Sequence, residues 1–301
     1  MQVFVRPQKP ASFDTDVKDA IEALEEFFRI REQTGSLPPT PVGVGQPAPE
    51  APKKPDFPDK WKKFKGEFSD AQHGKCGYCE MDVIGGQAGD VEHFFPKGEV
   101  WELGADPKTW GAERKSLSTV EGRKHNVIAE HGYWWLAYHW DNYLLACEVC
   151  NQYWKLSFFP VADTPRNLPP AKDKNEDALL LNPFGTEYDP CDHLAFDDLG
   201  QISALDKSLR GLATIQTCGL DRESIRKKRI EKASRAHFLV KELFSAAKVN
   251  DRNKIFEVLR DFKSLGDENF AYSGMVRAIF CQGTGMKWKA LEDILAKEDK
   301  K

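Results

Sequence analysis

The spacing of apolar side chains near the start of the chain predicts an amphipathic helix. In the run DVKDAIEALEEFFRIRE, Ile21, Leu24, Phe27 and Phe28 recur at helical spacing, as on a helix that packs one face against a core. The residues before this helix predict a short strand at Gln2–Arg6. The N-terminal region is therefore expected to be a strand followed by a helix.

A proline-rich segment interrupts the pattern. From Ser36 to Pro58 the chain carries eight of its 18 prolines. Proline fixes the backbone angle φ and donates no backbone hydrogen bond, so a segment of this composition favours an extended connector. We expect the first helix to end near Thr34 and residues 36–58 to form an exposed linker.

The middle of the chain alternates between aromatic and polar stretches. Trp61, Phe64 and Phe68 predict a helix that leads into the first cysteines. Residues 76–100 contain a pair of glycines and predict a β-hairpin. Residues 101–130 are polar and irregular, and the aromatic run YWWLAYHWDNYLLACEVC that follows them is expected to pack in a core.

The last third of the chain has a different pattern. Short apolar runs separated by Pro, Gly and Asp give way to mostly helical spacing from Lys207 onward. Together the patterns predict four regions: 1–35, 36–58, 59–165 and a mainly helical domain at 166–301. The expected fold class is α+β, with small strands embedded in a mainly helical protein.

Composition adds limits on location and partners. The chain has 301 residues, of which 41% are hydrophobic and 30% charged, as in a globular protein with a packed core. No apolar run approaches the roughly 20 residues that cross a membrane. The N-terminus lacks the features of a secretory signal, so a cytoplasmic location and no membrane contact are expected. The net charge of −4 restricts any nucleic-acid contact to a local basic patch or to a partner protein.

Four of the seven cysteines form two CxxC pairs, Cys76 with Cys79 and Cys147 with Cys150. A CxxC turn presents two thiolates on one side of a tight loop, and two such turns complete the tetrahedral sulfur shell that structural zinc prefers. Two pairs in one chain favour a four-cysteine zinc site over ordinary buried thiols. The remaining three cysteines are isolated and are expected in the core.

Polar residues of the types that metal-dependent nucleases use lie near the two pairs in the sequence. Glu92 and His93 follow the first pair, Asn142 precedes the second, and Asn151 and Lys155 follow it directly. The chain resembles the HNH (ββα-metal) endonucleases in their zinc-bearing form. The resemblance lies in the order of three motifs: CxYC, then an acidic residue and His followed by h-x-P, then Asn followed by CxxC-Asn and Lys, where h is a hydrophobic residue and x is any residue. The resemblance implies a ββα-metal core stabilised by the cysteine zinc site, and a phosphodiester hydrolase.

The resemblance also implies roles for three residues at a catalytic centre. His93 would be the general base, because an imidazole titrates near neutral pH. Glu92 and Asn151 would hold a catalytic Mg²⁺ or Mn²⁺, since carboxylate and amide oxygens are hard ligands that suit these ions. Most HNH proteins carry Asp where this chain has Glu92, and the longer side chain shifts the ion.

Three further residues receive supporting roles. Asn142 corresponds to the middle Asn of the HNH pattern, which ties the segment carrying the base to the rest of the domain. Lys97 and Lys155 are candidates for contacts with substrate phosphates. Taken alone, each lysine fits a solvated surface charge equally well.

The motifs CGYCE, VEHFFPK, HWDNYLLACEVCNQYWK, LLLNPF and DPxxHLAF narrow the resemblance to one group. They are similar to the HNH proteins of bacterial anti-phage systems such as Septu and certain retrons, in which an ABC-type (SMC-like) ATPase accompanies the nuclease. This resemblance spans roughly residues 61–229. It implies a nuclease subunit that acts on nucleic acid, DNA more than RNA, in complex with an ATPase.

The sequence leaves two alternatives open. One is a catalytically weak, zinc-stabilised module that binds nucleic acid or regulates an ATPase, and the second is a stand-alone McrA-like restriction endonuclease. A basic stretch from Arg222 to Arg235 in an expected helix, with Ile230, Ala233, His237, Val240 and Phe244 as its apolar face, favours nucleic-acid contact. A solvated helix surface or a docking site for an acidic partner would account for the same stretch.

Overall fold

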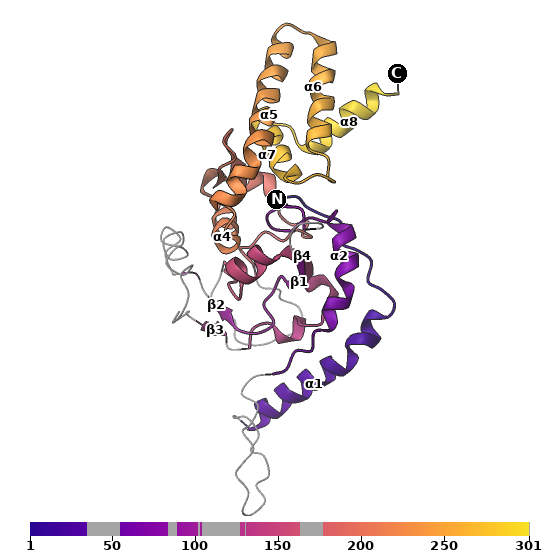
Figure 1. Cartoon of the computed structure of the whole chain (residues 1–301), viewed down its shortest axis with the longest axis vertical. Helices are drawn as coiled ribbons and strands as arrows, with labels where there is room; N and C mark the ends of the chain where they lie inside the picture. The colour runs from indigo at the N-terminus through magenta and orange to yellow at the C-terminus, as the bar shows by residue number, and fades with distance from the viewer. Residues whose placement is uncertain are drawn as a thin grey trace, which may run out of the picture.

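The computed structural model describes residues 1–34, 55–83, 89–101, 103, 127–129, 131–162 and 177–300. These residues form a mixed, helix-rich molecule with small two-stranded sheets, elongated along one axis (Figure 1). The coarse prediction of an α+β protein is confirmed. Most of the predicted linker, residues 36–54, lies outside the described residues, and the predicted division into four regions stays a prediction.

The N-terminal helix forms as predicted and ends where expected. Helix α1 spans Phe13–Thr34, and Phe28 is among the side chains it buries. The predicted strand at residues 2–6 is wrong. This segment has no strand partner among the described residues and is held by a backbone hydrogen bond from Phe4 N to Pro183 O at 2.8 Å. A strand needs a neighbour with a matching edge, and a loop carbonyl occupies that position here.

The helix expected before the first cysteines is also present, in two pieces. A 3₁₀ helix, η1 at Lys60–Phe64, leads directly into α2 at Lys65–Ala71. Trp61, Phe64 and Phe68, the residues that predicted this helix, are all buried. The rings of Phe64 and Phe68 pack against the aromatic segment that precedes the second CxxC pair.

The central sheet joins two segments that are distant in sequence. Strand β1 (Gly89–His93) pairs antiparallel with β4 (Tyr143–Cys147), in a register that places Gly89 opposite Cys147 and His93 opposite Tyr143. The local β-hairpin predicted within residues 76–100 is wrong, because the partner of β1 is β4. All five residues of β4 are buried, so burial of a continuous apolar strand selects this pairing over a local turn.

A short helix follows β4 directly. It is η4, a π-helix at Val149–Lys155, and it contains the wide hydrogen bond from Leu156 N to Asn151 O at 2.9 Å. The helix ends at Lys155, and the next residue, Leu156, adopts a positive φ of 48°. Strands β1 and β4 and helix η4 therefore form one unit of two strands and a helix. Its assignment as a ββα-metal core stays a proposal.

The remaining small elements flank this unit. Two further sheets pair β2 with β3 and β5 with β6. Their bounds are Val100–Trp101, Val127–Ala129, Leu194–Phe196 and Ile202–Ala204. Further 3₁₀ turns connect the elements: η2 at Trp134–Leu136, η3 at Trp140–Asn142, η5 at Pro190–Asp192 and η6 at Leu205–Lys207.

The C-terminal part is helical, as predicted. Its helices are α4 (Leu209–Cys218), α5 (Glu223–Lys248), α6 (Arg252–Leu265), α7 (Ser273–Thr284) and α8 (Trp288–Glu298). Helices α5 and α6 form an antiparallel pair that projects along the long axis, away from α1 (Figure 1). None of the described helices is long and apolar enough to cross a membrane.

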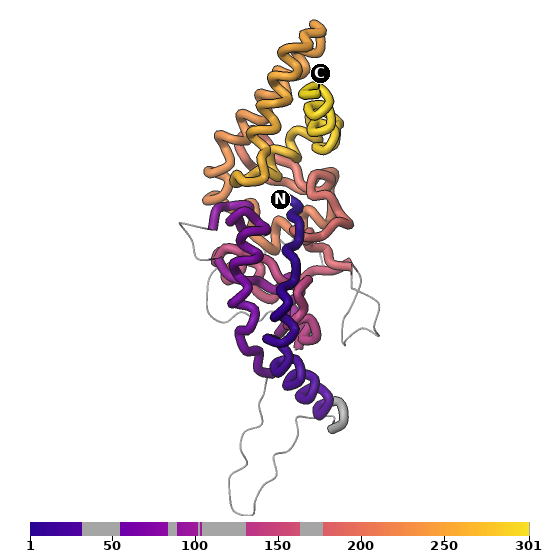
Figure 2. The backbone as a smooth tube through the Cα atoms, turned by 90° about the vertical axis from the view of Figure 1, so that its right-hand side faces the viewer, coloured from indigo at the N-terminus to yellow at the C-terminus, as the bar shows by residue number. Residues whose placement is uncertain are grey.

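One cluster of buried apolar side chains includes residues from nearly the whole length of the chain, from Met1 to Leu295. The first residues of the chain lie near the middle of the long axis, beside the C-terminal helices, before α1 runs toward the opposite end (Figure 2). Because the core is continuous, the cysteine pairs and the C-terminal helices pack against one another. Residues of the C-terminal helical region can therefore lie next to the paired cysteines.

Candidate metal centre and catalytic site

The two CxxC pairs come together in the described structure. The sulfur atoms of Cys76, Cys79, Cys147 and Cys150 all lie within 4.8 Å of one another, and all four side chains are buried. Cys79 Sγ and Cys147 Sγ are 3.8 Å apart. A tetrahedron with zinc–sulfur bonds of about 2.3 Å has edges of about 3.8 Å. The donor set and its dimensions therefore fit a closed zinc site, as the sequence predicted.

The backbone shapes each half of this cluster. In the first half, Cys76 N donates to Met81 O and Gly77 N donates to Leu145 O, both at 2.9 Å, which attaches the turn to β4. In the second half, Cys147 ends β4 and its Sγ accepts a hydrogen bond from Cys150 N at 3.4 Å. Hydrogen bonds from the neighbouring thiols lower the pKa of Cys147. Burial raises the pKa of Cys76, and hydrogen bonds with the neighbouring thiols raise the pKa of Cys150, so a bound zinc ion would be needed to hold all four as thiolates.

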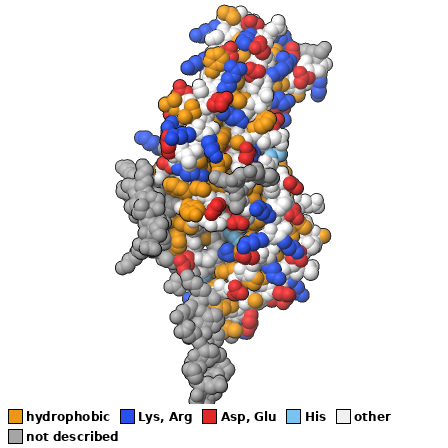
Figure 3. Space-filling model, viewed as in Figure 1, with side chains coloured by type: hydrophobic (Ala, Val, Ile, Leu, Met, Phe, Trp, Pro, Cys, Tyr) orange, Lys and Arg blue, Asp and Glu red, His pale blue; other side chains and the backbone are white. Residues whose placement is uncertain are grey.

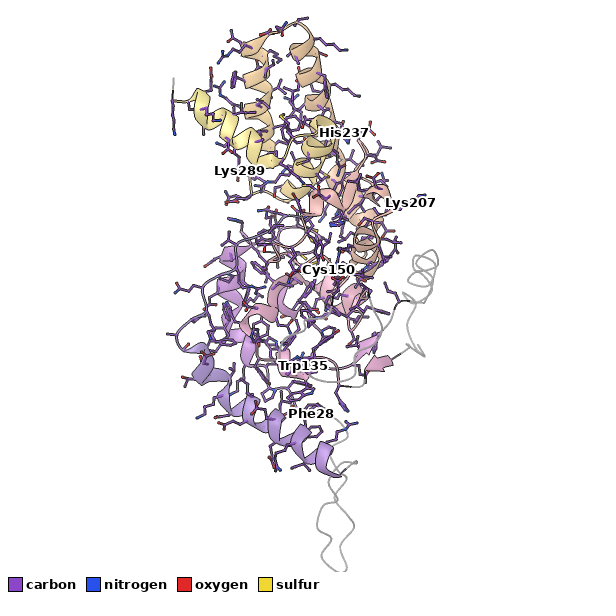
Figure 4. All side chains as sticks on the ribbon, turned by 180° about the vertical axis from the view of Figure 1, so that it is seen from behind. Phe28, Trp135, Cys150, Lys207, His237 and Lys289 are labelled. Atoms are coloured by element: carbon purple, nitrogen blue, oxygen red, sulfur yellow. The ribbon has the colours of Figure 1, made fainter. Side chains whose placement is uncertain are left out.

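An arginine between α4 and α5, Arg222, contacts the cysteine cluster. Arg222 Nη2 donates to Cys150 Sγ at 3.4 Å, and its Nη1 donates to the carbonyls of Cys218 and Gly219. Gly219 has a φ of +59°, and a Cβ there would lie 2.0 Å from the Trp154 ring. The end of α4 therefore packs closely on η4. Figure 4 labels Cys150 near the middle of the molecule, between the α1 end and the C-terminal helices.

The proposed base, His93, is buried at the end of β1. Its Nε2 lies 2.9 Å from Ala137 O, and because a carbonyl only accepts, Nε2 carries the proton. The ring packs edge-on against Trp61 and Tyr143, with centroids 4.5 and 5.1 Å away. Burial, and then the nearby charge of Lys97, lower the pKa of His93 well below its usual value. The imidazole is therefore neutral at physiological pH, with Nδ1 as its basic nitrogen.

Asn142 connects the segment after His93 to the aromatic segment. Its Oδ1 accepts from Phe95 N at 2.7 Å, and its Nδ2 donates to Phe95 O and Leu136 O, both at 3.0 Å. Its own carbonyl accepts from Phe94 N at 2.8 Å. The side chain is buried, with 2% exposure. These contacts are those of a residue that orients the backbone next to His93.

Glu92 forms a buried ion pair that the sequence did not indicate. Lys155 Nζ lies 2.7 Å from Glu92 Oε1 and donates to His93 O at 2.9 Å. Lys155 is fully buried, whereas the Glu92 side chain retains 10% exposure. The phosphate contact predicted for Lys155 is not supported by these surroundings, because its ammonium already has two partners and no access to solvent.

The other site residues lie around this ion pair. Asn151 lies four residues before Lys155 on η4, and its place at a catalytic ion stays a prediction. Lys97 Nζ is 4.4 Å from the centroid of the Trp61 ring. Burial lowers the pKa of Lys97, while the charge of Glu92 raises it. Lys97 thus lies close to Glu92 and His93, and its contact with a phosphate stays a prediction.

Sequence reasoning missed one carboxylate here. Asp90 lies two residues before Glu92 on β1, and alternate residues of a strand face the same side. Its Oδ2 accepts a hydrogen bond from Gln152 Nε2 of η4 at 3.3 Å. The strand periodicity within GDVEH would have pointed to it once β1 was assigned. Asp90 is a second hard oxygen donor on the face of β1 that meets η4.

The basic stretch of α5 is occupied by contacts within the chain. Arg229 is buried and donates to Leu220 O. Lys232 donates to Ala271 O at 2.7 Å, and Arg235 pairs with Asp261 at 2.8 Å. In the view of Figure 3, basic and acidic side chains alternate over the C-terminal helices. These contacts favour a structural role for the stretch over a nucleic-acid surface.

The predicted apolar face of α5 is partly wrong. Phe244, expected in the core, is 50% exposed, whereas Ala233 is buried as expected. The observed buried face is Ile225, Arg229, Ala233, Ala236, Leu239, Leu243 and Ala246. The buried face includes an arginine, which residue type alone would have assigned to the polar side.

Comparison with known proteins supports the resemblance. Over 162 residues the chain is 32% identical to the Septu protein PtuB of Bacillus mycoides (strain KBAB4), a match that covers 54% of this chain. The match covers 48% of that protein, so the chain spans about half the length of the relative it matches. The predicted resemblance to a Septu protein is confirmed. No family model matches the chain, and no solved structure is significantly similar to it.

Proposed function

We propose that this chain is a metal-dependent HNH endonuclease that hydrolyses phosphodiester bonds, DNA more than RNA. The observation that carries the proposal is the state of His93. Its ring is buried and neutral, its Nε2 is held by Ala137 O, and no described group hydrogen-bonds to Nδ1. A neutral imidazole held in one tautomer by a backbone carbonyl is equipped to take a proton from water.

The residues divide the reaction among them. His93 Nδ1 accepts a proton as a water oxygen attacks phosphorus, and the bond to the leaving oxygen breaks, with a solvent proton going to that oxygen. Ala137 O keeps the ring oriented and stabilises the imidazolium that results. Glu92 and Asn151, both hard oxygen donors, would hold a divalent ion, which when bound polarises the phosphate and stabilises developing charge. The cysteine zinc would be structural and take no part in the chemistry.

The setting of this activity follows from the resemblance. The matched relative is named a Septu protein, and the Septu systems to which the motifs are similar are anti-phage systems that pair an HNH protein with an ABC-type ATPase. We infer that this chain is the nuclease subunit of such a complex in the cytoplasm. Binding of an ATPase is expected to restrain or trigger cleavage.

The test is cleavage of plasmid and phage DNA by the purified chain and by its complex, with Mg²⁺ or Mn²⁺. We expect His93→Ala to lower the cleavage rate by about 100-fold or more, since positioned general bases contribute about that much. His139→Ala is the matched control, because His139 is exposed and its charged neighbour is the exposed Asp141. Equal cleavage by wild type and His93→Ala would refute the mechanism.

One observation favours a second candidate function. The carboxylate assigned to the catalytic ion, Glu92, is engaged by Lys155. A site whose ligand is permanently occupied would bind no ion, and the chain would then be a zinc-stabilised module that recruits nucleic acid or regulates an ATPase. Binding of DNA by the complex with no cleavage under any divalent ion would favour this function.

A further inference from the structure

The groups around Glu92, with Asp90 on the same strand counted, already carry at least as much positive as negative charge before any divalent ion enters. Glu92 is paired with Lys155, and Asp59 is paired with Lys62. The charges of Glu92 and Asp59 both act on the Lys97 ammonium. A divalent ion at Glu92 therefore adds two positive charges beside Lys155, which lies in a buried, weakly screened position.

Lys155 also leaves part of the carboxylate available. Its ammonium contacts Oε1 of Glu92, and the Glu92 side chain keeps 10% of its surface exposed. The same ammonium donates to His93 O, so one cation bridges the backbone of the base and the side chain of the ligand. An ion could bind the second carboxylate oxygen, Oε2, while Lys155 stays in place. The positive charge of the Lys155 ammonium would then repel the ion.

We propose that Lys155 keeps the divalent ion weakly bound until a substrate phosphodiester enters, so that ion and substrate bind cooperatively. This inference rests on the proposed function of the site. A phosphodiester brings the negative charge that the site lacks, which offsets the repulsion between the ion and Lys155. By linkage, the ion must raise the affinity for substrate by the same factor as the substrate raises the affinity for the ion. Lys155 is thus a positioning residue, because it acts through Glu92.

The first test measures Mn²⁺ binding to the zinc-loaded full chain without DNA, from the free-Mn²⁺ signal in electron paramagnetic resonance. The Mn²⁺ that the wild type binds and the Glu92→Gln variant does not bind is assigned to this site. We expect Lys155→Met to tighten Mn²⁺ binding at this site by about tenfold, because a buried like charge is removed. Lys227→Met, at an exposed lysine of α5 that pairs with Glu223, is the control and should leave Mn²⁺ binding unchanged.

A purely structural role for Lys155 predicts the opposite result. Unchanged or weaker Mn²⁺ binding by a Lys155→Met protein that retains one zinc and melts cooperatively would overturn the proposal. The second measurement keeps Lys155 and so does not depend on the folding of that variant. In a His93→Ala protein, whose cleavage is expected to be slower by about 100-fold or more, a short DNA duplex should raise Mn²⁺ affinity by at least about fivefold.

The two proposals fail in different ways. Mn²⁺ affinity that DNA does not alter, in a protein whose wild type cleaves DNA, would overturn the role of Lys155 and leave the nuclease intact. Absence of both Mn²⁺ binding at Glu92 and cleavage, with DNA present, would overturn the proposed function itself.

Discussion

Arg222 donates a hydrogen bond to the sulfur of Cys150 across 72 positions of sequence, with Nη2 and Sγ 3.4 Å apart. The residue immediately before α5 therefore contacts the four-cysteine cluster directly. Zinc with four thiolates carries a net charge of about −2, and the guanidinium is a cation placed to compensate part of it. Arg222, the first residue of the basic stretch, thus has a role at the cysteine cluster that does not involve nucleic acid.

Replacing Arg222 by methionine is expected to weaken zinc binding. The thiolate of Cys150 loses its hydrogen bond and a compensating charge, and such outer contacts contribute about 10- to 100-fold in metal affinity. Zinc transfer to a chromophoric chelator measures the effect. Arg226→Met is the control, because Arg226 pairs with the exposed Glu223 on the surface of α5. Equal zinc retention by the two variants would contradict a role for Arg222 at the cluster.

The chain is expected to bind one zinc ion through its four clustered cysteines. Cys150→Ser should lose this zinc and its cooperative thermal unfolding, because the buried cluster has no further metal ligand among the described residues. Elemental analysis of the purified protein gives the stoichiometry. Cys281→Ser, at a partly exposed cysteine outside the cluster, should retain a full equivalent. Zinc retention by Cys150→Ser would show that the site is assembled differently.

Asn142→Ala is expected to lower the free energy of unfolding by about 2–3 kcal/mol, since three side-chain hydrogen bonds are lost at about 1 kcal/mol each. Two backbone groups of Phe95 lose their partner in this variant. Urea denaturation measures the change. The adjacent Asp141→Ala, at a largely exposed side chain, should change stability by less than about 0.5 kcal/mol. Similar values for the two variants would argue against Asn142 as an organiser of this segment.

The burial of His93 predicts a pH dependence of stability. Its pKa lies well below the usual 6.5 in the folded protein. As the pH falls through about 6.5, the unfolded chain takes up a proton that the folded protein does not. The free energy of unfolding then decreases with falling pH, by at most about 1.4 kcal/mol per pH unit. The stabilising contribution of neutral His93 is thus complete above this pH and is lost below it.

Comparison with His93→Gln isolates this contribution from acid effects on the cysteine cluster, which both proteins share. Without added divalent ions, urea unfolding of the two proteins between about pH 7.5 and about pH 5.5 should show the wild type losing stability relative to the variant. Parallel stability curves would mean that His93 titrates normally and is not held neutral by burial.

Local patterns in the chain predicted much of the helical structure and the metal ligands. Helix α1 and the C-terminal helices follow from apolar spacing, which depends on neighbours three and four residues apart. The CxxC pairs identify the four clustered cysteines because each turn is local chemistry. Even so, the stripe predicted on α5 included Phe244, which is exposed, since residue type does not reveal which face the rest of the fold covers.

By itself, therefore, the sequence identified the four cysteines that cluster and most of the helical segments, and it nominated His93 as a candidate base. Only the tertiary structure decided that β1 pairs with β4, that Lys155 is buried against Glu92, and that Arg222 reaches Cys150. These contacts join positions far apart in the chain, 72 residues in the case of Arg222 and Cys150, and they depend on desolvation and charge compensation in a shared core. Such energies arise only when distant segments are packed together, so no local spacing encodes them.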